Sequence, residues 1–157
     1  MKKNFDIAGA IILDMHDAIV SLLGLIAGLY FAFTNTNIII LSCIISSVTA
    51  SLSMGAANYL AVKASDKNSA LRAAIYTGIA YMTTCVLLIL PLLIFYNRDI
   101  AIFGVFIMAI LIIYFFNLAF YKKKQFYRHF FEMLSICIIV SIIAFFIGET
   151  AHQIFRI

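Results

Sequence analysis

Long apolar stretches separated by short polar breaks are the dominant pattern of this chain of 157 residues. A helix needs about 20 apolar residues to cross the roughly 30 Å of hydrocarbon in a bilayer, and five stretches are long enough. We therefore expect an all-α, polytopic membrane protein of five transmembrane helices, in which residues 1–157 form a single transmembrane domain. The expected helices cover residues 5–33, 38–62, 70–96, 100–121 and 126–155.

The first expected helix has a seam of small and polar residues along one face. They recur at spacings of three and four, which places them on one side of a helix: Asp14, Asp17, Ser21, Gly24 and Gly28. An ionised Asp at the centre of a span costs roughly 2.5–3.5 kcal/mol, so two in one span indicate a function. Asp14 and Asp17 are one turn apart and can converge on one ion or one proton.

The remaining seam residues suit close contact with another helix. Gly24 and Gly28 are four residues apart, a small-residue spacing that lets two helices approach closely, and Ser21 precedes them on the same face. We expect Ser21, Gly24 and Gly28 to form a helix-packing or dimer seam.

A second seam, with a residue every fourth position, follows on the second expected helix: Ser42, Ser46, Ala50, Met54 and Asn58. Its small side chains suit tight packing against the first helix. If the seams meet, Met54 and Asn58 face the same space as Asp14 and Asp17. Both also have a structural interpretation, because Met more often packs than binds metal and Asn often hydrogen-bonds between helices.

Together these side chains offer carboxylate oxygen, amide oxygen and thioether sulfur. Oxygen ligands suit divalent cations in general, and a thioether adds affinity for the softer transition metals. His16 points about 100° away from its neighbours and is an auxiliary candidate. Protons compete with metal for carboxylates, so metal movement can be coupled to proton movement. From the residues alone, we interpret the two seams as an ion or proton path.

Composition excludes an ordinary soluble domain, since 65% of residues are hydrophobic, 11% are charged and the mean hydropathy is +1.10. Cys43, Cys85 and Cys137 lie in separate apolar stretches and are expected to be core residues. Glu132, Glu149 and His152 lie near the ends of the fifth helix, where interfacial positions carry little charge penalty. No nucleophile motif or cofactor fingerprint appears, so we expect neither an enzyme nor a bound cofactor.

The distribution of basic residues predicts the orientation of the chain in the membrane. Nine fall on one side of a five-span arrangement: Lys2, Lys3, Lys63, Lys67, Arg72, Lys122, Lys123, Lys124 and Arg128. Arg98 and Arg156 fall on the other side. The N-terminus is therefore expected in the cytoplasm and the C-terminus outside. This asymmetry accounts for the net charge of +4 without a nucleic-acid partner; Lys122 to Lys124 suit anionic lipid headgroups.

Two stretches resemble a known family. Residues 17–28, D-A-I-V-S-L-L-G-L-I-A-G, are similar to the first-helix signature N-D-G-L-V-S-x-x-G-L-V-A-G of the vacuolar iron transporters. Residues 51–61, S-L-S-M-G-A-A-N-Y-L-A, are similar to their second-helix signature A-L-S-M-x-x-G-x-Y-L-S. Shorter similarities to the bacterial branch occur at residues 74–81, 90–93 and 131–134.

The resemblance implies a homodimer of five-helix protomers, with the first helices near the two-fold axis. It implies export of Fe²⁺ or Mn²⁺ from the cytosol in exchange for protons, here across a bacterial inner membrane. By position, Asp17 and Met54 match metal contacts of the family. Asp14, His16 and Asn58 are then auxiliary ligands or, for Asp14 together with Asp17, proton carriers.

The chain also departs from the family pattern. His16 replaces the Asn of the N-D-G triplet, Ala18 replaces its Gly, and Asp14 stands where relatives usually carry Gly. Many relatives insert a Glu- and Met-rich metal-binding domain between helices two and three, whereas Lys63 to Ser69 is short and basic. We therefore expect Asp14 to supply some of that negative charge locally.

Two alternatives remain open. The chain can be a non-transporting membrane subunit that partners a ferritin-like or metal-binding protein, which reconstitution of the chain alone would distinguish. It can also be a proton-coupled exporter of organic cations, although the first helix has no aromatic residue beside Asp14 and Asp17.

Overall fold

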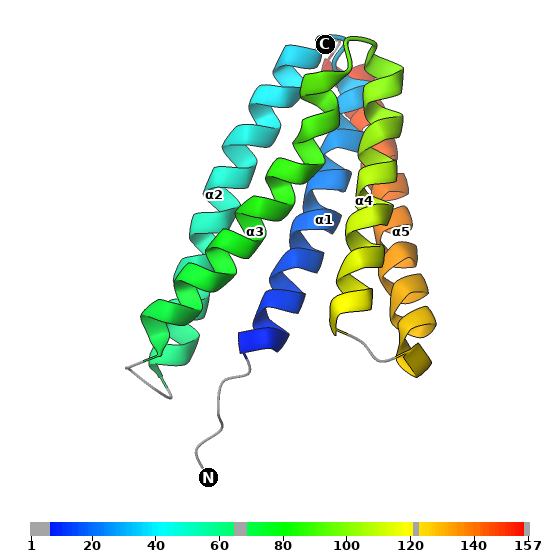
Figure 1. The fold of residues 1–157 in the computed structure, drawn as a ribbon. Helices are drawn as coiled ribbons and strands as arrows, with labels where there is room; N and C mark the ends of the chain where they lie inside the picture. Colours follow the sequence, from blue (N-terminus) through cyan, green and yellow to red (C-terminus); the bar gives the residue numbers. More distant parts are fainter. Residues whose placement is uncertain (1–6, 65–68, 121–122, 156–157) are drawn as a thin grey trace.

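The computed structural model describes residues 7–64, 69–120 and 123–155, and these form five helices. They are α1 (Ile7–Ala32), α2 (Thr36–Lys63), α3 (Ala70–Ile94), α4 (Arg98–Phe120) and α5 (Lys123–Phe155). Each is long and apolar enough to cross a membrane. Successive helices run in opposite directions along one bundle (Figure 1). The predicted all-α fold with five transmembrane helices is confirmed; the expected start of helix one at Phe5 lies outside the described residues.

Short polar turns separate the helices, and asparagine side chains in two of these turns cap the helix that follows. Before α2, the Asn35 side chain accepts a hydrogen bond of 2.9 Å from the Asn37 backbone N–H. Before α4, the Asn97 side chain accepts from the N–H groups of Asp99 and Ile100, at 3.0 and 3.3 Å. These bonds satisfy amides that the first turn of a helix leaves unpaired.

The helix α1 is the central element of the bundle and contacts all four other helices. Its buried side chains, among them Ile19, Leu22 and Ile26, form one apolar core with residues of the other four. Cys43, Cys85 and Cys137 are buried free thiols, in agreement with their expected core positions. The other four helices therefore all pack against α1.

The helix α2 packs more extensively against α3 than against α1, and it does so through residues outside the seam predicted to face the first helix. A Cβ on Gly55 would lie 3.1 Å from the Ala74 carbonyl oxygen, and one on Gly78 would lie 3.4 Å from that of Ser51. Gly55 therefore allows these two backbones to approach closely, a geometry that spacing within α2 alone does not specify.

The helix α5 packs closely against two glycines of α1. A Cβ on Gly24 would meet Val140 at 3.1 Å, and one on Gly28 would meet the Ala144 carbonyl oxygen at 3.2 Å. Gly148 of α5 lies directly against the Gly28 backbone. Gly24 and Gly28 thus form a helix-packing seam inside the protomer, in the half of α1 nearer its C-terminus.

We predict that Gly148→Ala destabilises the protein by about 1–3 kcal/mol, because its methyl group would overlap the Gly28 backbone and separate α1 from α5. The midpoint of thermal unfolding in detergent measures the effect. Gly78→Ala is the matched control, since its added Cβ has only ordinary contacts at 3.4 and 3.9 Å. Equal midpoints for the two variants would contradict the close α1–α5 contact.

Candidate functional site

Asp14 is a buried carboxylate shared by three helices. Its side chain is 1% exposed, and the Asn58 amide of α2 donates a hydrogen bond of 2.8 Å to its Oδ2. The Thr77 hydroxyl of α3 lies close to the same carboxylate, and it donates its own hydrogen bond of 2.9 Å to the Ala73 carbonyl oxygen. A buried charge without a partner would cost several kcal/mol, so the Asn58 amide stabilises Asp14 inside the bundle.

Asp17 lies one turn further along α1 in a different environment. It is exposed, on the same face as Leu13, which is 65% exposed, and Ser21. The Ser21 hydroxyl is 2.9 Å from the hydroxyl of Tyr81 on α3, and Asp17 lies close to that same Tyr81 hydroxyl. Of the two carboxylates, Asp14 is therefore buried inside the protomer and Asp17 is exposed on its surface.

The two predicted seams meet at Asp14 and Asn58. The structure brings Asn58 to Asp14, whereas Met54, one turn earlier on α2, is half-buried against the apolar core. Among residues 7–64, 69–120 and 123–155, no group of three or more His, Cys, Asp or Glu side chains is arranged to hold a metal ion. A metal held at Asp17 would therefore need ligands other than a preformed cluster of this kind within one protomer.

His16 turns towards α5. Its ring is half-buried, and within the described part of the chain its Nδ1 has no hydrogen-bond partner. Asp17 and Glu132 are the charged groups that act on this ring, and Glu132 in turn lies 3.6 Å from His129. Glu132 thus adds a carboxylate of α5 to the surroundings of His16, a role that its interfacial position alone did not suggest.

Glu149 and His152 lie at the opposite end of the bundle, and both are exposed. The His152 Nδ1 is 3.2 Å from the carbonyl oxygen of Ala32, which ends α1. Neither side chain approaches the Asp14 and Asp17 level, because the two levels lie at opposite ends of α1 (Figure 1).

The α3 residues of this site, Thr77 and Tyr81, had no role assigned from sequence. Both are almost completely buried, at 0% and 2% exposure, and both contact the α1 polar face. The sequence does contain a pattern that could have identified them, because two hydroxyl side chains four residues apart in an apolar span share one helix face. Pairing that face with α1 required the three-dimensional arrangement.

A comparison with known protein families gives a match over the first two helices. Residues 8–68, which span α1, α2 and both motifs, match the model of the VIT family. The resemblance to the vacuolar iron transporters is thereby confirmed over these residues, and it associates α1 and α2 with metal-ion transport. A comparison with curated proteins gave no match.

We predict that Asp14 and Asn58 are energetically coupled. Asn58→Ala removes the hydrogen-bond donor to the buried carboxylate and should lower the free energy of unfolding by about 1–3 kcal/mol. In an Asp14→Ala background the same change should cost at least about 1 kcal/mol less, because no carboxylate remains to be satisfied. Unfolding of the four proteins of this cycle in detergent measures the coupling; strictly additive effects would contradict the hydrogen bond.

Proposed function

We propose that this chain, which matches the VIT family over its first two helices, is a homodimeric transporter that exports Fe²⁺ or Mn²⁺ from the cytosol in exchange for protons. The observation that carries the proposal is the exposed carboxylate of Asp17 within the span of α1. An ionised side chain facing hydrocarbon is strongly disfavoured, so Asp17 needs water, a cation or another protein surface beside it.

A second copy of the chain supplies that surface. Exposed small and polar residues also follow one another along α2, namely Ser46, Thr49, Ser53 and Ala57. Lipid-facing helix surfaces are normally apolar and bulky, whereas small and hydroxyl side chains are typical of helix contacts and polar cavities. A two-fold axis beside α1 would bring two Asp17 carboxylates to one cation, and Met54 and His16 lie within a turn of this level.

Charge balance supports the exchange of metal for protons. Two carboxylates that face each other in a low-dielectric site carry two negative charges, which one divalent cation neutralises. When the cation leaves, protons can neutralise the same oxygens. Asp14, whose Oδ2 accepts from Asn58, would serve beside the path as an auxiliary ligand or proton carrier through its remaining acceptor sites.

The orientation follows from the basic residues. Lys63, Arg72 and Arg128 lie at one end of the bundle, where α2 ends and where α3 and α5 begin, and Arg98 lies at the other end. The positive-inside rule assigns the first end to the cytoplasmic side of the membrane. The membrane in this proposal is a bacterial inner membrane. Asp14 and Asp17 lie in this cytoplasmic half, so metal would enter from the cytosol.

We predict that Asp17→Asn lowers Mn²⁺ flux in proteoliposomes to the level of empty vesicles, because the amide cannot balance a divalent charge. Glu149→Gln is the matched control: it also neutralises an exposed carboxylate, at the other end of the bundle, and should transport normally. Flux should also respond to an imposed pH gradient. Normal transport by Asp17→Asn would refute the site, and flux indifferent to pH would refute proton exchange.

The same assay separates the alternatives. Autonomous Mn²⁺ or Fe²⁺ flux by the chain alone excludes an obligate non-transporting subunit. Flux of organic cations with no metal flux would favour the organic-cation exporter.

We also predict that Leu13→Cys cross-links two copies of the chain in membranes, because Leu13 shares the exposed face of Asp17 and a two-fold axis pairs equivalent residues. The native cysteines are buried, so they should not react. Leu111→Cys, exposed on α4, is the control. Equal cross-linking at both positions, or none at Leu13→Cys, would contradict a dimer formed through α1.

A further inference from the structure

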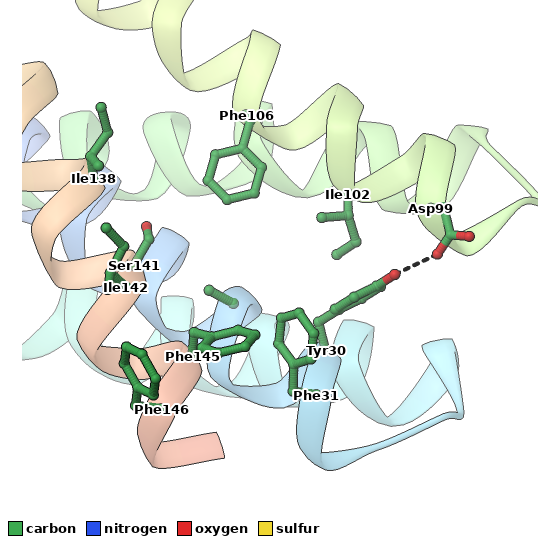
Figure 2. A pocket seen from close by; sticks show the side chains of 11 residues that line it. Tyr30, Phe31, Asp99, Ile102, Phe106, Ile138, Ser141, Ile142, Phe145 and Phe146 are labelled. Carbon is green, nitrogen blue, oxygen red and sulfur yellow. Dashed lines mark hydrogen bonds between the residues drawn. The ribbon is translucent and has the colours of Figure 1, made fainter. Parts of the chain in front are cut away.

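A second feature of the fold is a cavity of about 520 Å³ between α1, α4 and α5, at the end of the bundle away from Asp14. Figure 2 shows aromatic rings around it, including Phe106 of α4, Phe31 of α1, and Phe145 and Phe146 of α5. Such a volume is typical of a site for a small organic molecule or part of a lipid.

The cavity opens towards the bilayer. Its rim is formed by exposed apolar side chains, among them Ile138, Ile142 and Phe146, which are 51%, 51% and 60% exposed. On α1 its lining residues Ala27, Tyr30 and Phe31 lie roughly 15–20 Å along the helix axis from Asp17. The opening is therefore at a different level of the bundle from Asp17, and an occupant would arrive from the membrane.

A buried hydroxyl in the wall lacks a partner. Ser141 is 8% exposed, lines the cavity, and has no hydrogen-bond partner for its Oγ among the described residues. On the same helix, Ser135 and Thr150 each donate to the carbonyl oxygen four residues earlier, at 2.7 Å. Ser141 does not, so its hydroxyl is available to an acceptor on an occupant.

Both signs of charge lie at the outer end of the cavity, where Asp99 lines the wall and Arg98 lies beside it against Tyr30. The Tyr30 hydroxyl donates to Asp99 Oδ1 (Figure 2). The Arg98 guanidinium lies 4.1 Å from the Tyr30 ring centroid, and its Nη1 donates to the Phe33 carbonyl oxygen at 3.1 Å. A carboxylate and a guanidinium on consecutive residues complement an ammonium and a phosphate carried by one molecule.

The spacing of these polar groups matches a glycerophospholipid. The ring centroids of Phe145 and Phe31 are 4.2 Å apart, so Phe145 marks the level of Tyr30 and Asp99. Ser141 is one turn earlier on α5, about 6 Å deeper. The headgroup layer of a bilayer is roughly 5–7 Å thick on each side, which separates the charged headgroup from the hydrocarbon boundary by a similar distance.

We propose that this cavity binds one zwitterionic glycerophospholipid with a primary ammonium, that is, a phosphatidylethanolamine. Its ammonium lies against Asp99 and its phosphate against Arg98. An ester carbonyl accepts the Ser141 hydroxyl, and one acyl chain lies between Phe106 and Ile138. The site is independent of the metal path and holds α4 and α5 against the outer half of α1.

Native mass spectrometry of the purified protein tests this assignment. The probes are phosphatidylethanolamine, phosphatidylcholine and phosphatidylglycerol with identical acyl chains, added singly. We expect wild type to retain the first lipid preferentially, and Ser141→Ala and Asp99→Asn each to lower its occupancy about fivefold, as loss of one hydrogen bond or charge contact implies. Ser135→Ala, which removes a hydroxyl of α5 outside the cavity, should retain the lipid as wild type does.

A second measurement protects against variants that lose lipid because they are unstable. Added phosphatidylethanolamine should raise the thermal midpoint of wild type and of Ser135→Ala, and raise that of Ser141→Ala much less. Equal retention of the three lipids, or retention unaffected by Ser141→Ala and Asp99→Asn, would identify adventitious annular lipid and overturn the proposal. Cross-linking between copies through Ile142→Cys would also overturn it, by showing that a second chain covers the opening.

Discussion

A carboxylate inside a membrane-spanning bundle must be hydrogen-bonded, and Asp14 meets this need through the Asn58 amide 2.8 Å away. The requirement joins α1 to α2 at the cytoplasmic end proposed above, and Thr77 places α3 beside the same carboxylate. Gly55 lets α2 and α3 approach each other closely, so the pair presents Asn58 and Thr77 together. The hydrogen-bonded carboxylate and the glycine contacts are thus parts of one arrangement.

The polar face of α1 serves two partners. In its outer half, α5 covers the face by packing on Gly24 and Gly28. In its inner half the same face is open, and Leu13 and Asp17 are exposed there. A single seam in the sequence is therefore divided between contact within the protomer and a surface that, in the proposed dimer, encloses the metal path. The division explains why glycines follow the acidic residues along one helix.

Much of the fold could be predicted because hydropathy, helix length and polar breaks are local properties of the chain. The Asp14–Asn58 contact also followed from seam spacing. Other features depend on how helices are arranged around α1. The spacing of Asp14 and Asp17 placed both on one face, yet the α2–α3 pair covers Asp14 and leaves Asp17 exposed. Tyr81 was missed for the same reason, since its partner Ser21 is 60 residues away.

Anomalous X-ray scattering from crystals grown with Mn²⁺ tests the central claim most directly. The account predicts a dimer with one manganese peak on its two-fold axis, between the Asp17 carboxylates of the two α1 helices and within reach of Met54. A dimer in which Asp17 faces lipid, or a peak away from α1 with none at Asp17, would contradict it.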